Sequence, residues 1–129
     1  MGSGTLATWP EVHAHLAATY GAVTVDGMLQ IRVTLPMTAT ARARVIAMEV
    51  RQVPELGAWF KITCVIGPMH HRSPCELLAA NIRATIGTWC THEGELAIRQ
   101  TLPTEGLRIA DLDETVRTLA QVAAADQEA

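Results

Sequence analysis

The sequence lacks the long apolar run and the leader that would direct a chain into or across a membrane. A membrane-spanning helix needs roughly 18 consecutive apolar residues. The best candidate here, residues 59–69, is interrupted by Lys61 and Pro68. Residues 1–4 contain neither a basic region nor an apolar stretch, so we expect no secretory signal. No membrane association is therefore expected.

Cysteine is also scarce. The 129 residues contain only Cys64, Cys75 and Cys90. An odd number in a chain of this length favours a reducing compartment over a framework of disulfide bonds. We therefore expect a cytoplasmic protein.

Aromatic and basic residues are few. Aromatics make up 4% of the chain, and ten basic residues stand against thirteen acidic ones, which gives a net charge of −3. Nucleic-acid binding usually depends on a dense cationic face and on aromatic rings that stack with bases. The nine arginines and Lys61 are instead scattered along the chain, so we expect no nucleic-acid partner.

The sequence offers no catalytic cluster. A Ser, Cys or Thr nucleophile needs a neighbouring base that a third group orients. The two serines are Ser3, near the N-terminus, and Ser73, which is placed to cap a helix. No Gly-rich phosphate loop follows a predicted strand. We therefore expect neither enzymatic activity nor a cofactor.

What the sequence has is enough apolar material for one core. Hydrophobic residues make up 49% of the chain and charged residues 18%, and a chain of this length can bury a core without disulfides or metals. We expect one domain over residues 8–125, with disordered tails at 1–7 and 126–129.

Three helices are expected. The first covers residues 9–20, with Thr8 as its cap and an apolar face of Val12, Leu16 and Tyr20. The second follows Ser73, has its apolar stripe at Leu78, Ile82 and Thr85, and stops at Gly87. The third starts near Asp111, where Ile109, Leu112, Val116, Leu119 and Ala123 recur at helical spacing.

The segments between the helices read as strands. Residues 23–35 form a predicted hairpin that turns at Asp26-Gly27, and residues 88–102 form a second that turns at Glu93-Gly94. Two further strands are expected over 44–53 and 58–66. The order α-β-β-β-β-α-β-β-α and the hairpin signals predict an α+β fold, with helices packed on a largely antiparallel sheet.

The chain also contains an internal similarity. Residues 27–36 read GMLQIRVTLP and residues 94–103 read GELAIRQTLP, with seven of the ten positions identical. Each copy follows a capped helix and a glycine. We interpret this as two helix–hairpin halves placed pseudo-symmetrically in one sheet, with chance similarity of two amphipathic hairpins as the alternative.

Residues 74–123 carry a resemblance to a known group of proteins. They include LLAANI from Leu77, IGT from Ile86, GELAIRQTLP from Gly94 and DETV from Asp113. This pattern of a helix with Leu-Leu and then Asn, two strands and a last amphipathic helix resembles the type III secretion chaperone-like superfamily. That superfamily includes the Tir-type chaperones and the YbjN-type bacterial domains.

The resemblance implies a non-enzymatic homodimer that shields an apolar segment of a client protein. Dimerisation is expected through the middle helix and the strand after it, at Leu78, Ile82 and Trp89. Partner binding is expected at Leu29, Ile31, Val33 and Trp59. From the alternation of their strands, we expect Trp59 and Trp89 on the sheet face opposite the main apolar set.

Two alternatives stay open. One is a regulatory domain of the YbjN type. The other is a thiol- or metal-responsive sensor that uses Cys75, Cys90, His71 and His92, although the spacing of these residues does not match the usual zinc-ligand pairs.

Overall fold

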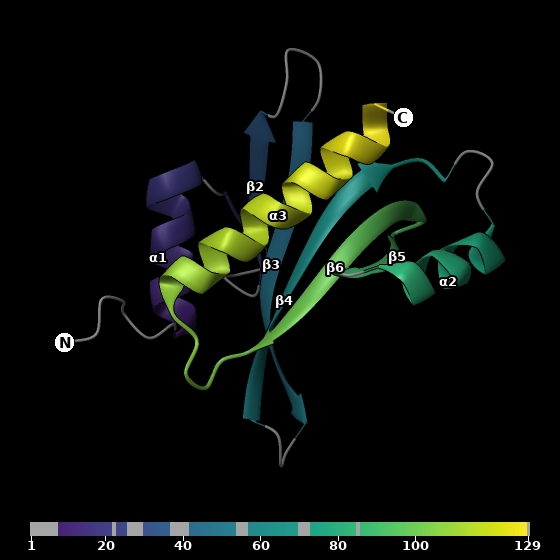
Figure 1. Cartoon of the computed structure of the whole chain (residues 1–129). Helices are drawn as coiled ribbons and strands as arrows, with labels where there is room; N and C mark the ends of the chain where they lie inside the picture. Colours follow the sequence, from purple (N-terminus) through teal and green to yellow (C-terminus); the bar gives the residue numbers. More distant parts are fainter. Residues whose placement is uncertain are drawn as a thin grey trace.

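The computed structural model describes residues 8–21, 23–25, 30–36, 42–53, 57–69, 73–84 and 86–128. Within these ranges the elements follow the predicted order α-β-β-β-β-α-β-β-α (Figure 1). They are α1 (Trp9–Tyr20), β1 (Val23–Val25), β2 (Gln30–Pro36), β3 (Arg42–Val53), β4 (Gly57–Gly67), α2 (Pro74–Arg83), β5 (Thr88–His92), β6 (Glu95–Pro103) and α3 (Ile109–Glu128).

The strands form one sheet in the order β1-β2-β3-β4-β6-β5, and every neighbouring pair is antiparallel. This confirms the predicted α+β fold. The hairpins β1–β2 and β5–β6 lie at the two ends of the sheet, with the long hairpin β3–β4 between them. The predicted turn at Glu93-Gly94 is confirmed, since both residues have positive φ, at 51° and 83°. The turn predicted at Asp26-Gly27 lies outside the described residues.

The helix starts follow from their caps. The side chains of Thr8 and Ser73 accept hydrogen bonds from the backbone N–H of Glu11 and Glu76, at 3.4 and 3.2 Å. Each bond satisfies a donor that the first helical turn leaves free.

Two helix boundaries differ from the prediction. The second helix, α2, ends at Arg83, because Ala84 turns to an extended conformation before Gly87 is reached. The third, α3, starts at Ile109, where the Asp111 carboxylate accepts a bond from the backbone N–H of Arg108. It continues to Glu128, beyond the domain end predicted at residue 125.

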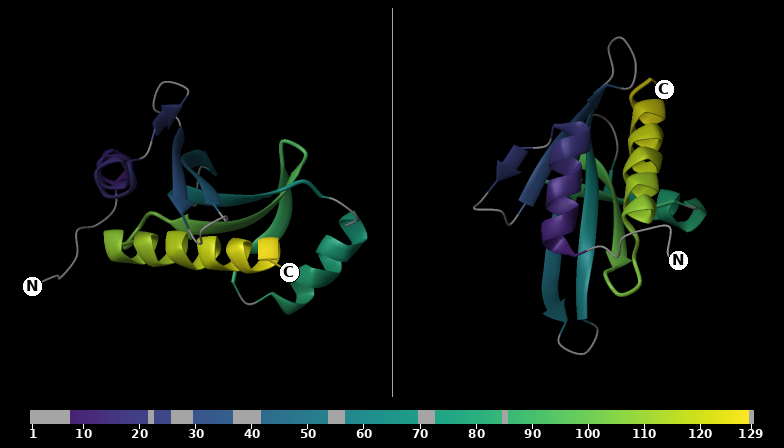
Figure 2. Two further views of the ribbon diagram at one scale, coloured as in Figure 1. Left: turned by 90° about the horizontal axis from the view of Figure 1, so that it is seen from above. Right: turned by 90° about the vertical axis from the view of Figure 1, so that its left-hand side faces the viewer.

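One face of the sheet is covered by α1 and α3 and forms the core (Figure 2). Phe60 is fully buried at its centre, and the predicted stripe of α3 is buried against the sheet from Leu112 to Ala123. None of the described helices has the length and hydrophobicity that crossing a bilayer requires.

Gly87 allows a close approach between the start of β5 and α3. A Cβ at this position would lie 2.8 Å from Cγ1 of Ile98 and 3.0 Å from Cδ2 of Leu119. Its φ of 72° is also one that L side chains rarely adopt. Gly94 has a similar φ of 83°, but a Cβ there meets no atom within 4 Å.

This difference predicts unequal costs for two alanine substitutions. Gly94→Ala should lower the free energy of unfolding by about 1 kcal/mol through backbone strain. Gly87→Ala should cost roughly 1–3 kcal/mol more because the added methyl overpacks the core. Urea denaturation of both variants measures the difference, and equal losses would contradict the packing of α3 over β5 and β6.

Candidate functional site

The outer face of α2 carries exposed apolar side chains. Leu78 is 67% exposed and Ile82 is 87% exposed, and Ile86, just after the helix, is 43% exposed. Of the helix residues, only Leu77 is buried. Two residues of the predicted stripe therefore face solvent in the single chain. The third, Thr85, lies outside the described residues.

Asn81 holds α2 against the edge strand of the sheet. Its side-chain Nδ2 donates to the carbonyl of Trp89 at 3.1 Å, and its Oδ1 accepts from the backbone N–H of Trp89 at 2.6 Å. These bonds occupy the outward backbone groups of Trp89 on β5, which would otherwise be free to pair with another strand. The helix thus replaces a neighbouring strand, and its apolar stripe points outward.

Trp89 corrects one prediction. Its partner across β6 is Ile98, a core residue, so its side chain lies on the covered face of the sheet rather than on the opposite face. It is half-buried and packs against the core. Of the three predicted dimerisation residues, Leu78 and Ile82 share an exposed face, whereas Trp89 lies against the interior.

The predicted partner-binding residues do not share one surface. Ile31 and Val33 are 0% and 2% exposed within the core, so the expectation that they contact a partner is corrected for the single chain. They are buried because they share the sheet face that α1 and α3 cover. Trp59 is half-buried on the opposite face, as expected. Leu29 lies outside the described residues.

On the same face as Trp59, but at the opposite end of β3 and β4, the sheet forms a shallow hollow of about 220 Å³. The residues that line it come from β2, β3, β4 and the β5–β6 hairpin: Arg32, Val33, Thr34, Arg44, Val45, Ile46, Val65, His92, Glu93 and Glu95. In a flat sheet, β2 and β5 would be separated by four strand spacings, roughly 19 Å. Strands from both ends of the sheet line one hollow because the sheet curls away from α3 (Figure 2).

One salt bridge crosses this hollow. Nη2 of Arg44 on β3 lies 2.9 Å from Oε2 of Glu95 on β6, so the pair spans β4 above Val65. The hydrogen bond from Arg44 lowers the pKa of Glu95 below its ordinary value. The two side chains are 50% and 37% exposed, so solvent screening keeps the contribution of this pair to stability small.

The residues of the sensor alternative are not brought together. Cys75 is exposed at the start of α2, whereas Cys90 and His92 lie on β5, and His71 is outside the described residues. Over the part of the chain that the structure describes, no three His, Cys, Asp or Glu side chains form a potential metal site. Burial raises the pKa of the Cys90 thiol and raises that of Cys64 to about 12.

A polar cluster between α1 and α3 was not predicted. Nε2 of His15 lies 2.8 Å from both carboxylate oxygens of Asp113, and the Tyr20 hydroxyl donates to Oδ1 of Asp113 at 2.8 Å. Thr19 approaches the other ring nitrogen of His15 at 3.4 Å. No local pattern connects residues 98 positions apart, so only the packing of the two helices reveals the cluster.

The comparisons with known proteins bear on the fold. The sequence matches no protein-family model, and no curated protein sequence resembles it significantly. Among solved structures, it is similar to a chain in the structure of the HopA1-SchA chaperone-effector complex. The TM-score is 0.65 at 13% sequence identity, over 94% of each chain.

The chain thus shares the fold of that chain. The similarity covers nearly the whole chain, including the N-terminal half, which lies outside residues 74–123. The two copies of the internal similarity lie in this fold at related places, with β2 next to one edge strand and β6 next to the other. The fold shared with a chain of this complex therefore agrees with the resemblance of residues 74–123.

The cluster around Asp113 predicts an unusual titration of Tyr20, which is the only tyrosine in the chain. Burial, followed by the hydrogen bond to Asp113, raises the pKa of Tyr20 from 10.0 to about 12. The folded state thus holds this proton more tightly than the unfolded state. Its contribution to stability should be complete below pH 10 and be lost as the pH rises towards 12.

The absorbance of the phenolate measures this pKa directly, with circular dichroism to confirm that the protein stays folded. Asp113→Asn should move the midpoint towards 10.0 without reaching it, because burial of the ring remains. Asp111→Asn, on the same helix but with its carboxylate bound to the backbone of Arg108, is the matched control. An unchanged midpoint in Asp113→Asn would contradict the cluster.

Proposed function

We propose that this protein is a non-enzymatic, chaperone-like binding protein that acts as a homodimer and shields an apolar segment of a partner protein. The observation that carries the proposal is the exposed apolar stripe of α2, formed by Leu78, Ile82 and Ile86. The shared fold with a chain of a chaperone-effector complex supports it. The scarcity of candidate nucleophiles supports a binding role over catalysis, since one of the two serines caps α2.

The stripe is suited to a second copy of the same chain. Burying a Leu or Ile side chain contributes about 1.5–3 kcal/mol, so leaving Leu78 and Ile82 in water forgoes several kcal/mol per chain. A two-fold axis places the same patch on both subunits, so an apolar helix face can pack against itself. Asn81 keeps this face outward and the helix rigid against β5.

A groove beside the stripe would accept the apolar segment of a client. It has a volume of about 330 Å³, and its walls come from the loop before β5, from β6 and from α3. Ile86 and Leu102 provide its apolar surface, and its polar surface comes from Gln100, Thr115, Thr118 and the carboxylates of Asp111 and Glu114. Because Ile86 follows α2 closely in the chain, a client in the groove would lie near the end of the helix that carries the stripe.

We also propose that the protein is cytoplasmic, as its cysteine content predicts. Of the two types that the resemblance leaves open, we propose the Tir type over the YbjN type, because the proposed protein shields a client. The thiol sensor is less favoured, because reactive thiols have a lowered pKa, whereas burial raises the pKa of both Cys64 and Cys90.

The dimer is tested by the solution mass from light scattering. The wild-type protein should have about twice the 13.9 kDa mass of one chain. Leu78→Asp should give a folded monomer, because burying an unpaired carboxylate in the interface costs several kcal/mol. Arg83→Asp places the same carboxylate on the polar side of α2 and should remain a dimer. A monomeric wild type would overturn the dimer.

The thiols provide a second test that also examines the sensor alternative. Cys75 precedes Leu78 by three positions on the same face of α2, so the proposed dimer covers it. Its alkylation should be slow in the wild-type dimer and fast in the Leu78→Asp monomer. Cys64, fully buried with a raised pKa, should react in neither until the protein is unfolded. Rapid oxidation of Cys75 and Cys90 in the native wild type, or bound zinc, would favour the sensor.

A further inference from the structure

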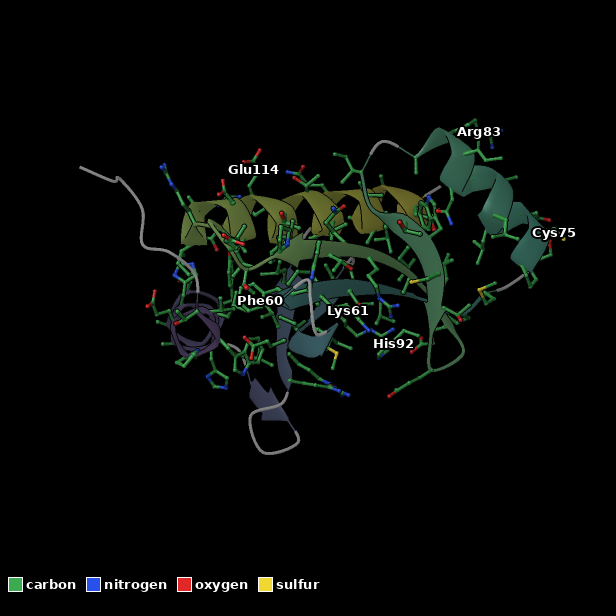
Figure 3. The ribbon with its side chains drawn as sticks, turned by 90° about the horizontal axis from the view of Figure 1, so that it is seen from below. Phe60, Lys61, Cys75, Arg83, His92 and Glu114 are labelled. Carbon is green, nitrogen blue, oxygen red and sulfur yellow. The ribbon has the colours of Figure 1, made fainter. Side chains whose placement is uncertain are left out.

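One face of the sheet has no helix over it in the described part of the chain. Figure 3 shows Lys61 and His92 on the side of the sheet that faces away from α3, which carries Glu114. Residues on this face are the strand neighbours of the core residues. They include Arg32 beside Ile31 and Arg99 beside Ile98. The surface is therefore part of the sheet but separate from both the α2 stripe and the groove beside it.

The internal similarity places two arginines at related positions on this face. In the alignment of residues 27–36 with residues 94–103, Arg32 corresponds to Arg99. The strand register puts them in one row across the sheet, in which Arg32 pairs with Ile46, Ile46 with Thr63, and Thr63 with Arg99. The two halves of the chain thus contribute one arginine each to the same face of the sheet, and Arg32 also lines the hollow.

The floor between these arginines is apolar. Ile46 is 7% exposed, Val65 is 3% exposed and Ala97 is fully buried, although no described helix covers them. Lys61 lies two residues from Thr63 on β4, so it adds a third cation to the same face. We refer to Arg32, Ile46, Lys61, Val65 and Arg99 as the cationic trough.

No described acidic residue forms a salt bridge with the cations of the trough. Arg44 has Glu95 as its partner, but Arg32 and Lys61 form no salt bridge with any described residue. Arg99 donates from Nε to the neutral hydroxyl of Thr63 at 3.0 Å. The opposite side of the molecule is acidic, since α3 carries Asp111, Asp113, Glu114 and Asp126 against a single arginine. A chain with a net charge of −3 thus has a locally positive sheet face.

We infer that the cationic trough binds an extended, acidic segment of a partner protein, with carboxylates at Arg32 and Arg99. This inference rests on the proposed function and specifies the chemistry of the client. Arg32 and Arg99 are three strand spacings apart, roughly 14 Å along the sheet. An extended chain advances about 3.3 Å per residue. Carboxylates about four residues apart therefore match the two arginines.

A polypeptide fits this surface better than a nucleic acid does. Glu93 and Glu95 line the same hollow and would repel a polyanion with evenly spaced charges. A peptide can place its carboxylates only at the arginines and so avoid both glutamates.

The experiment selects ligands from a displayed library of random peptides about twelve residues long, enough to cross the trough in an extended conformation. The wild-type full-length protein is the bait, and the selected peptides are then synthesised and their Kd values measured. The trough variant is Arg32→Glu/Lys61→Glu. The matched control, Arg83→Glu/Arg117→Glu, reverses two exposed arginines on α2 and α3. Circular dichroism and light scattering confirm that both variants keep the wild-type fold and mass.

We expect the selected peptides to be enriched in Asp and Glu at a spacing of about four residues, and their affinity to fall with added salt, because exposed charges are screened. The trough variant should bind them about tenfold or more weakly, because like charges then face each other. The control should bind them as the wild type does. A poly-deoxythymidine strand should compete poorly.

Three results would overturn the inference. In the first, the selected peptides have no excess of acidic residues. In the second, the trough variant and the control lose the same affinity for the peptides. In the third, the deoxythymidine strand binds more strongly than any peptide. Apolar peptides that bind both variants equally, but lose binding in Leu102→Glu, would leave the proposed function standing and remove only the trough. A selection that enriches no peptide would count against both.

Discussion

The packing of α3 across the central strands is the constraint on which the rest of the molecule depends. The helix presents an apolar stripe from Leu112 to Ala123 that is fully buried against β3, β4 and β6. A sheet with one apolar face has to bury that face, and here α3, with α1 beside it, occupies most of the available area. Gly87 allows the closest approach, since a side chain there would meet Ile98 and Leu119.

Two functional surfaces follow from this arrangement. Because α1 and α3 occupy the covered face, α2 is displaced to the edge of the sheet, where Asn81 binds the backbone of Trp89 and leaves Leu78 and Ile82 exposed. The other face of the sheet is left without a helix among the described elements, and it curls into the trough that contains Arg32 and Arg99. A stable core and two unpartnered surfaces thus have the same cause. In our proposals, the first surface serves a second copy of the chain and the second serves a client.

The elements themselves could be predicted from local patterns. Caps at Thr8 and Ser73, the turn at Glu93-Gly94 and alternating strand residues are signals within a few positions, and the structure confirms each of them. Helix ends were less predictable. The helix α2 ends at Arg83, where Ala84 becomes extended, rather than at Gly87, and α3 starts at Ile109 rather than near Asp111.

The surfaces depended on knowledge that no local pattern contains. Alternation shows which side chains share a face, but not which face the helices cover, so Ile31 and Val33 could be placed together and still be misjudged as partner-binding residues. Trp89 was misjudged because its strand is short and its position depends on pairing with Ile98. His15, Tyr20 and Asp113 meet only because α1 and α3 pack side by side. The sequence by itself thus determined the elements, their order and the apolar stripes, because these arise from contacts between near neighbours. Only the tertiary structure decided which face was buried, which helix was left at the edge and which arginines came into one row, because these depend on contacts between distant parts of the chain.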